Sequence, residues 1–461
     1  MTIGAVDGSA LGRDSGTART ALATGPDGPE PRAFSVLDEL NCYFDTPAEP
    51  NNVHVEVWLP GHLSPPALRA AVSSVLADVP AARARRVVGA GRASYAWEFP
   101  PAADVDPVSV TDWRSEAELD LARARFLSAA PELDFSPPFR LLLAQGPDRD
   151  SLILNAHHAA FDGRSCVRLL GLIADLYDGG QAAEAAAADR ASASASVAAP
   201  RSAPSDWPGR LRKATWLRKT ARIAAQHETG RAWRKVPGYG LSLLEWPGVP
   251  ATSRLSGDSH VTVNDLLIAA LIETIARWNS ARRRPSRRIR ISMPIDTRPP
   301  GNADELGNLS RLCTVSADPR TEADLIAAVA GQTRLAKREP GPMVGPVQAA
   351  TARTRLPTSV KRILVRLAVR SVGRLQCDTS LLSNLGKITD PPRFGRLVPT
   401  SMWFSTSAHM PRGLSVGAIS VGGRLQLCFR YRKALLDDVA GRAFAAEYAA
   451  VLSALAGGEP G

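Results

Sequence analysis

Two adjacent histidines occupy the segment best suited to chemistry, Asn155-Ala-His157-His158-Ala-Ala-Phe-Asp162-Gly163. The apolar run SLILN before it predicts a strand, and residues 164–177 after it predict a helix with one apolar face. Neighbouring side chains at a strand end point to opposite faces, so only one histidine can face a cavity. The other must be satisfied inside the protein. No third ligand stands at a suitable spacing nearby, so we expect no metal site.

An imidazole in this position suits general acid–base catalysis. The ordinary pKa of histidine lies near neutral pH, so a ring that reaches the proton directly can remove it. No serine or cysteine nucleophile motif stands beside the histidines, so the proton would come from a substrate's own hydroxyl or amine. Gly163 lets a backbone or a ligand approach closely. The structural alternative is a pair of buried histidines with Asp162 as a cap.

The segment HHAAFDG resembles the HHxxxDG motif of the CoA-dependent acyltransferase superfamily. That group includes nonribosomal peptide condensation domains, polyketide-associated acyltransferases, wax ester synthases and plant-type alcohol acyltransferases. Further stretches resemble the same family in the same order, and together they cover roughly residues 33–457. They are DFSPPFR (134–140), TVNDLLIAALIETIARW (262–278), MPIDTRP (293–299) with ELGNLS (305–310), and LLSNLGKI (381–388).

The late part of the chain departs from two branches of that superfamily. The plant-type DFGWG motif is absent, and SNLGK stands nearest to its place. The Ser-Asn-Val-Pro-Gly sequence of wax ester synthases is replaced by Ser-Asn-Leu-Gly-Lys. The chain is therefore most similar to a free-standing nonribosomal peptide condensation enzyme or a polyketide-associated acyltransferase.

The resemblance implies an α/β fold, a pseudo-dimer of two chloramphenicol-acetyltransferase-like lobes with a central tunnel open at both faces. It makes His158 the catalytic base or nucleophile-orienting group and His157 a structural residue. Asp162 is expected to be structural too and to pair with Arg298, because a buried carboxylate needs such a partner. Gly163 is expected to leave room for the pantetheine arm. The residues expected to bind substrate near the tunnel are Ser383 and Asn384.

The resemblance also implies the substrates and partners. The donor would be an acyl or aminoacyl phosphopantetheine thioester on an acyl- or peptidyl-carrier protein, or acyl-CoA, and no cofactor would be bound permanently. The acceptor would be a small alcohol or amine, and the product an ester or amide of a specialised metabolite. The chain shows no adenylation or carrier segment, so the carrier would be met in trans. The alternatives are a CoA-dependent or lipid-directed O-acyltransferase and a non-catalytic member that recruits partners.

Composition agrees with a monomeric cytoplasmic enzyme. Of the 461 residues, 44% are hydrophobic and 22% charged, which is ordinary for a globular protein of about two or three folding units. No apolar run reaches the roughly 20 residues that cross a bilayer. The five cysteines are odd in number and lack C-x-x-C spacing, which favours buried free thiols in a reducing compartment.

Four regions follow along the chain. Residues 1–30 predict a disordered leader, 31–178 an N-terminal lobe, 179–205 an Ala/Ser-rich linker or loop, and 206–461 a C-terminal lobe. Ser64 followed by two prolines predicts a helix start, and Thr262 with Asp265 predicts another. Strands are predicted at 53–59, 139–143, 151–156, 289–293, 414–421 and 425–431, and helices at 211–233, 261–279, 359–373 and 436–455.

Charge is divided unevenly between the two halves. The first 178 residues carry 24 acidic and 15 basic side chains, a net charge of −9, which leaves +20 on the remainder because the chain totals +11. A basic surface attracts a carrier protein, CoA phosphates or an anionic membrane. We expect no nucleic-acid partner, since no recognised binding motif is present. The basic helix at 359–373 is expected to be an ordinary surface helix, with membrane contact as the alternative. His409 is expected to be an exposed loop histidine, with a substrate-side contact as the minority alternative.

Overall fold

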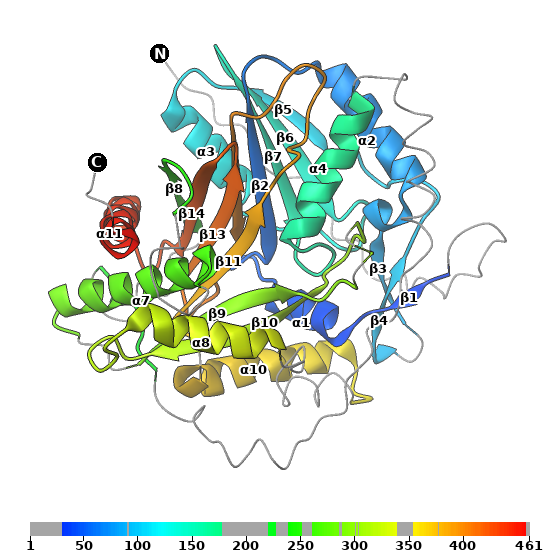
Figure 1. Ribbon diagram of the computed structural model, residues 1–461. Coiled ribbons are helices and arrows are strands. Elements are labelled where there is room, and N and C mark those ends of the chain that lie inside the picture. The colour runs from blue at the N-terminus through cyan, green and yellow to red at the C-terminus, as the bar shows by residue number, and fades with distance from the viewer. Residues whose placement is uncertain are drawn as a thin grey trace, which may run out of the picture.

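The computed structural model describes residues 30–89, 92–177, 220–226, 238–250, 261–284, 288–299, 301–302, 304–338, 354–376 and 378–457. Helices and strands alternate, and the strands form three sheets (Figure 1), which confirms the predicted α/β class. The leader, apart from Glu30, and the linker at 179–205 lie outside the described residues. Of the helix predicted over 211–233, only 220–226 are described.

That part of the prediction is wrong, because residues 220–226 form no helix. Their backbone is bonded to other segments instead. The N–H of Ala224 donates to the Asn279 Oδ1 at 2.7 Å, and the Trp278 indole donates to the Ala224 carbonyl at 3.0 Å. Ile223 and Ala224 are buried in the core of the second lobe. Tertiary contacts therefore override the local helical pattern.

The N-terminal lobe is built on a five-stranded sheet in the order β12-β2-β7-β6-β5. Its central strands coincide with the predicted strands or extend them by a few residues. Helix α2 (Pro65–Asp78) begins where predicted, with the Ser64 hydroxyl accepting from the N–H of Ala67. Apolar side chains from α2 and α4 (Gly163–Tyr177) form one core with the sheet. The strands are β12 (Ser401–Thr406), β2 (Asn52–Leu59), β7 (Asp150–His157), β6 (Phe139–Gln145) and β5 (Val108–Asp112), with α3 (Glu116–Phe126) beside them.

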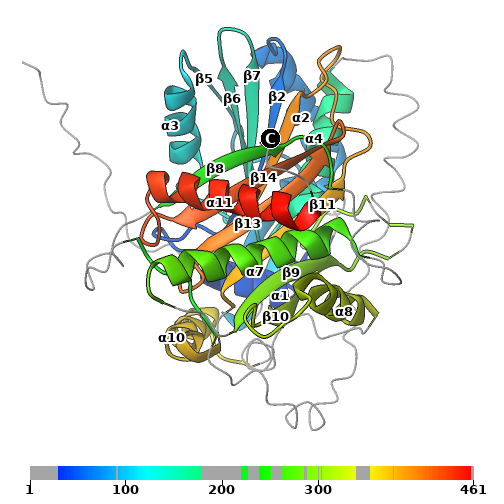
Figure 2. The same cartoon turned by 60° about the vertical axis from the view of Figure 1, so that its left-hand side comes forward.

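The C-terminal lobe is built on a six-stranded sheet in the order β10-β9-β11-β13-β14-β8. Helix α7 (Val263–Ala281) opens with the predicted capping box, in which Thr262 and Asp265 bond each other's backbone N–H. Figure 2 shows α7 and α11 (Asp438–Ala456) side by side against this sheet. The strands are β10 (Ser310–Ala317), β9 (Ile289–Asp296), β11 (Ser380–Lys387), β13 (Leu414–Val421), β14 (Arg424–Arg432) and β8 (Tyr239–Trp246), with α8 (Leu325–Arg338) beside β10.

A small third sheet, in the order β1-β4-β3, lies beside helix α1 (Val36–Phe44). Helix α10 (Thr358–Gln376) packs on α1 from the second half of the chain. The buried Lys361 ammonium lies 3.3 Å from the Glu39 carboxylate. Ile363 and Leu367 are 59% and 51% exposed, so α10 turns a basic face inward and an apolar stripe outward. The small elements are β1 (Arg32–Ala33), β4 (Tyr95–Glu98), β3 (Arg85–Val88) and the 3₁₀ turn η1 (Pro80–Arg83).

The second half of the chain contributes one strand to the N-terminal sheet. β12 belongs to the second half of the chain, yet it pairs antiparallel with β2 along the edge of the N-terminal sheet. The two sheets approach closely where β12 meets β13, since a Cβ on Gly417 would lie 1.9 Å from the Phe404 carbonyl oxygen. The boundary predicted between 178 and 206 therefore divides the sequence but not the sheets.

Helix α11 is long and apolar enough in composition to cross a membrane. It is instead a core helix, because Phe444, Tyr448 and Leu452 pack against the C-terminal sheet. The four cysteines of the described part of the chain, Cys42, Cys166, Cys313 and Cys428, are free thiols.

Candidate functional site

The two histidines lie where β7 ends and before α4 begins. His157 is 2% exposed, and its Nδ1 accepts from the Ala159 N–H at 3.0 Å. A nitrogen that accepts cannot carry the proton, so the neutral ring is protonated on Nε2. That nitrogen lies 3.8 Å from the Asp45 carboxylate. Burial would raise the pKa of Asp45, but His157 and the Asn51 N–H bring it below its ordinary value. His157 is thus buried with one ring nitrogen hydrogen-bonded to the backbone and the other facing the Asp45 carboxylate.

His158 is half-buried, and no described side chain bonds to its ring. Nδ1 is buried without a hydrogen-bond partner among the described residues, and Nε2 is neither buried nor bonded to any of them. Burial lowers the pKa of His158, while its own carbonyl, that of Phe161 and the Asp162 carboxylate oppose the shift. A lowered pKa leaves the ring neutral near pH 7, with a lone pair able to take a proton.

The backbone of His158 is fixed from both lobes. Its N–H donates to the Asn51 carbonyl at 2.9 Å, and its carbonyl accepts from the Asn308 amide at 2.8 Å. Asn308 belongs to the GNLS sequence, whereas Asn51 carries no sequence signal beyond standing before a predicted strand. Neither residue was predicted as a site residue. The resemblance of ELGNLS to the family was the signal that could have indicated Asn308, and Asn51 had no such signal.

The ion pair expected between Asp162 and Arg298 is present at 3.0 Å, and both side chains are buried. Asp162 also caps α4 by accepting from the Ser165 N–H at 2.9 Å. Its second oxygen accepts from the Leu309 N–H at 2.9 Å. Arg298 extends the network by donating to the Ser165 hydroxyl and to the Glu305 carbonyl. The carboxylate thus joins the motif to residues 296–309 of the second lobe.

His409 is not the exposed loop residue predicted from the sequence. Its Nε2 lies 3.2 Å from the Asn51 Oδ1, and its ring packs at 6.0 Å from that of Phe44. Burial, followed by the charge of Arg412, lowers the pKa of His409 to about 3. The prediction was wrong because Asn51 and Phe44 come from the other end of the chain.

Gly163, the last residue of the motif, is closely packed against side chains of β12 and of β11, the strand that carries the late Ser-Asn pair. A Cβ on Gly163 would lie 2.5 Å from the Phe404 ring and 2.9 Å from Leu385, so these side chains fill the space expected to admit a pantetheine arm. Ser383 is buried in β11, two residues before Leu385. Asn384 is half-buried, and its Oδ1 accepts from the Gly386 N–H at 2.8 Å. A substrate-binding role for this pair stays a prediction.

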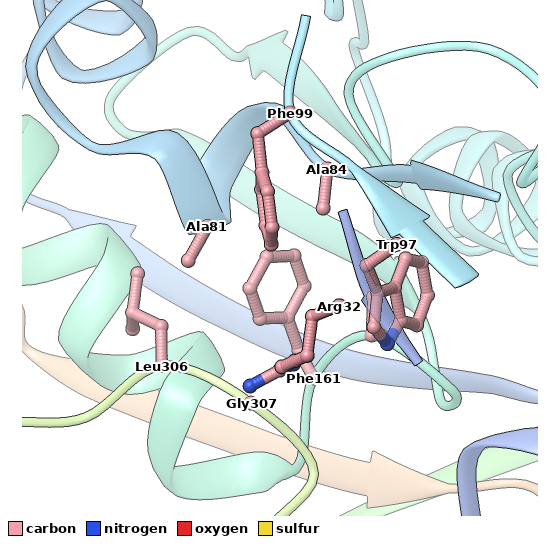
Figure 3. Close-up of a pocket in the computed structure, with 9 residues that line it drawn as sticks. Arg32, Ala81, Ala84, Trp97, Phe99, Phe161, Leu306 and Gly307 are labelled. Carbon is pink, nitrogen blue, oxygen red and sulfur yellow. The ribbon is translucent and has the colours of Figure 1, made fainter. Parts of the chain in front are cut away.

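Two cavities adjoin the motif. A narrow crevice beside the loop is lined by Phe99, Phe161, Trp97, Leu306 and Gly307, with Phe99 and Phe161 one above the other between Trp97 and Leu306 (Figure 3). A polar cavity of about 160 Å³ adjoins His157, and its lining also includes Asp45 and Cys42. His158 lines neither of these two cavities.

A second polar cluster lies inside the fold. Ser405, His54 and Glu56 form a chain of hydrogen bonds at 3.1 and 3.2 Å, in the order of residues found in some hydrolase triads. Arg123 donates to both Glu56 oxygens at 2.6 and 2.8 Å, and the Ser151 hydroxyl donates at 2.6 Å. Ser405, His54 and Glu56 are 0% exposed, so no substrate reaches them, and the cluster is structural.

Comparison with known proteins finds relatives of the chain and of its fold. No protein-family model matches the chain. The chain is 30% identical over 421 residues to the uncharacterized protein Rv2305 of Mycobacterium tuberculosis, covering 86% of this chain and 93% of that protein. It resembles the first condensation domain of the calcium-dependent antibiotic synthetase, with a TM-score of 0.65, 14% identity and coverage of 93% and 97%.

A second solved structure is the starter condensation domain of rhizomide synthetase, in a mutant form in complex with C8-CoA. It matches with a TM-score of 0.60, 14% identity and coverage of 93% and 95%. These matches show a condensation-domain fold over nearly the whole chain. The two-lobed pseudo-dimer implied by the sequence resemblance is therefore the fold of this protein.

Proposed function

Because the chain belongs to one family with the mycobacterial protein Rv2305 and has the condensation-domain form of the CoA-dependent acyltransferase fold, we propose that it is an acyltransferase. It transfers an acyl or aminoacyl group from a phosphopantetheine thioester to an alcohol or amine and makes an ester or amide of a specialised metabolite. The observation that carries the proposal is His158, a half-buried neutral imidazole whose backbone both lobes hold and whose Nε2 is open.

His158 acts as the general base. Its Nε2 takes the proton of the acceptor hydroxyl or amine as that atom attacks the thioester carbonyl carbon. The carbon–sulfur bond then breaks, and the imidazolium returns the proton to the departing thiolate, so a thiol leaves and no acyl-enzyme forms. His157 cannot take this role, since its Nδ1 already accepts from Ala159 and its Nε2 carries the proton. Holding both reactants beside one ring supplies much of the rate gain.

The donor is carried by an acyl- or peptidyl-carrier protein met in trans, in the cytoplasm. Two observations favour a phosphopantetheine donor: the fold is that of condensation domains, and the second half of the chain carries a net +20 that attracts an acidic carrier. A CoA-dependent or lipid-directed transfer is the second candidate, because one structural neighbour was solved in complex with C8-CoA.

The test incubates the pure protein with panels of acyl-carrier proteins and acyl-CoAs, together with alcohol and amine acceptors, and detects products by mass spectrometry. We expect a thioester-dependent product whose rate falls 10²–10⁴-fold in H158A, the usual contribution of a general base. The control is H62A, which removes a histidine whose side chain is 54% exposed. Full activity in H158A would exclude the mechanism, and transfer only from CoA would select the second candidate.

The pH profile gives an independent test of His158. Burial lowers the pKa of this group from its ordinary value of 6.5, so the base stays deprotonated into mildly acidic buffer. We expect kcat/KM for acyl transfer to an alcohol acceptor, which does not itself titrate in this range, to stay level from pH 8 down to about 6.5 and to fall only below that value. A profile that falls already between pH 8 and 7 would contradict a depressed pKa.

A further inference from the structure

A second histidine lies next to the motif without any assigned role. His409 follows β12, the strand that the second half of the chain contributes to the N-terminal sheet. Asn51 connects it to the catalytic loop, because the Asn51 carbonyl accepts from the His158 N–H at 2.9 Å and the Asn51 Oδ1 lies 3.2 Å from the His409 Nε2. One buried asparagine thus contacts both histidines.

The hydrogen bonds of Asn51 determine where His409 carries its proton. The Asn51 amide nitrogen donates to the Asn41 carbonyl at 2.9 Å, and a carbonyl can only accept, so the orientation of the amide is fixed. Oδ1 therefore accepts, from the Ser407 hydroxyl at 2.6 Å and from His409. The proton of His409 must be on Nε2, which leaves a lone pair on Nδ1.

That lone pair is free. Nδ1 of His409 is neither buried nor bonded to any residue that the structure describes. The ring stays neutral because burial and the cations Arg412 and Arg430 disfavour a further positive charge. His409 thus presents a neutral hydrogen-bond acceptor, fixed in orientation, beside the loop that carries His158.

We propose that His409 is a second substrate-contacting residue, whose Nδ1 accepts a hydrogen bond from the acceptor substrate. This inference rests on the proposed acyl transfer. The proton that His158 removes is not available to His409, so the contact requires a second N–H or O–H. The acceptor is therefore a primary amine, which keeps one N–H while losing the other, or an alcohol with a neighbouring hydroxyl. No bond to His409 forms or breaks, and its role is to orient the nucleophile.

Two variants separate this role from a structural one. H409Q places an amide nitrogen where Nε2 stood, so it keeps the bond to Asn51 but loses the acceptor at the δ position. H409N keeps an acceptor near the δ position and loses the bond to Asn51. Steady-state kinetics are measured for both with a primary amine and its N-methyl analogue, and with a 1,2-diol and its mono-ol. Thermal melting checks that both variants fold.

We expect the wild type to prefer the acceptor with the second donor at least about tenfold, because a bound acceptor without that donor would cover the His409 Nδ1 and leave it unpaired. H409Q should lose that preference, raise the acceptor KM about tenfold and leave the donor KM unchanged, while folded H409N keeps the preference. If the wild type is active and H409Q keeps the same acceptor preference and acceptor KM, this inference alone is overturned. The same holds if H409Q and H409N both fold and lose the acceptor preference equally. A wild type that transfers to no acceptor overturns it together with the proposed function.

Discussion

Removal of the Arg298 side chain should destabilise the fold far more than removal of an exposed arginine. Asp162 and Arg298 are both buried, and the carboxylate keeps only two backbone N–H donors once the guanidinium is gone. Loss of one member of a buried pair costs about 3–5 kcal/mol, because the other charge is left uncompensated. R298M should therefore lower the free energy of unfolding by that amount, which is a factor of 10² or more in the unfolding equilibrium.

The assay is urea denaturation followed by tryptophan fluorescence. R320M is the matched control, because Arg320 pairs with Asp318 at 3.1 Å on the surface, where such a pair contributes little to stability. A D162N/R298M double variant completes a mutant cycle, and residues in direct contact should show a coupling energy of about 1–3 kcal/mol. A loss in R298M no larger than that in R320M, or a coupling near zero, would refute the reasoning.

Two further perturbations test the buried polar contacts. E56Q should cost about 3–5 kcal/mol, because it leaves the buried Arg123 with only the exposed carboxylate of Asp120 as a charged partner. Burial would raise the pKa of Glu56, but Arg123 holds it well below 4.5, so this stability is present above the unfolded pKa and lost as the pH falls. The difference in the free energy of unfolding between wild type and E56Q, measured by urea denaturation, should therefore become smaller below about pH 4.5. A difference that stays constant with pH would contradict a lowered pKa of Glu56 in the folded protein. On α10, K361A should cost more than 2 kcal/mol and I363A about 0.5 kcal/mol or less, since Lys361 is buried against Glu39 and Ile363 is 59% exposed. If I363A melts at a lower temperature than K361A, α10 packs by its apolar face instead.

Local signals predicted the elements that flank the site. Ser64 with its two prolines marked the start of α2 to the residue. Thr262 with Asp265 marked the capping box of α7, whose first helical residue, Val263, lies two positions after the predicted start at 261. Such caps depend only on groups three positions apart. Gly422 and Gly423 form the turn between β13 and β14 with φ values of +57° and +78°, which favour glycine, so a Gly-Gly pair between two apolar runs is a local turn signal. Such features need no knowledge of distant segments, and the structure confirms them.

Features that depend on distant partners could not be predicted in the same way. β12 is a short strand that pairs with β2, which lies more than 300 residues earlier in the chain. No local pattern in the sequence indicates that pairing. The apolar stripe of α10 resembles a buried face in the sequence, yet Ile363 and Leu367 are exposed. The buried positions include Val365, in a small apolar cluster, and Lys361, which bonds Glu39 and Ala93. His409 was assigned to an exposed loop for the same reason, since nothing near it in the sequence indicates Asn51.

The position of β12 in the N-terminal sheet explains why the candidate site needs both lobes. The strand carries Ser407 and His409 onto Asn51, which in turn accepts from the His158 N–H. The His158 carbonyl is held by Asn308 of the other lobe. The backbone of one residue is therefore fixed at its donor by the N-terminal lobe and at its acceptor by the C-terminal lobe. A change in the angle between the lobes must stretch one of these bonds or turn the peptide, so the position of the imidazole depends on how the two lobes are joined.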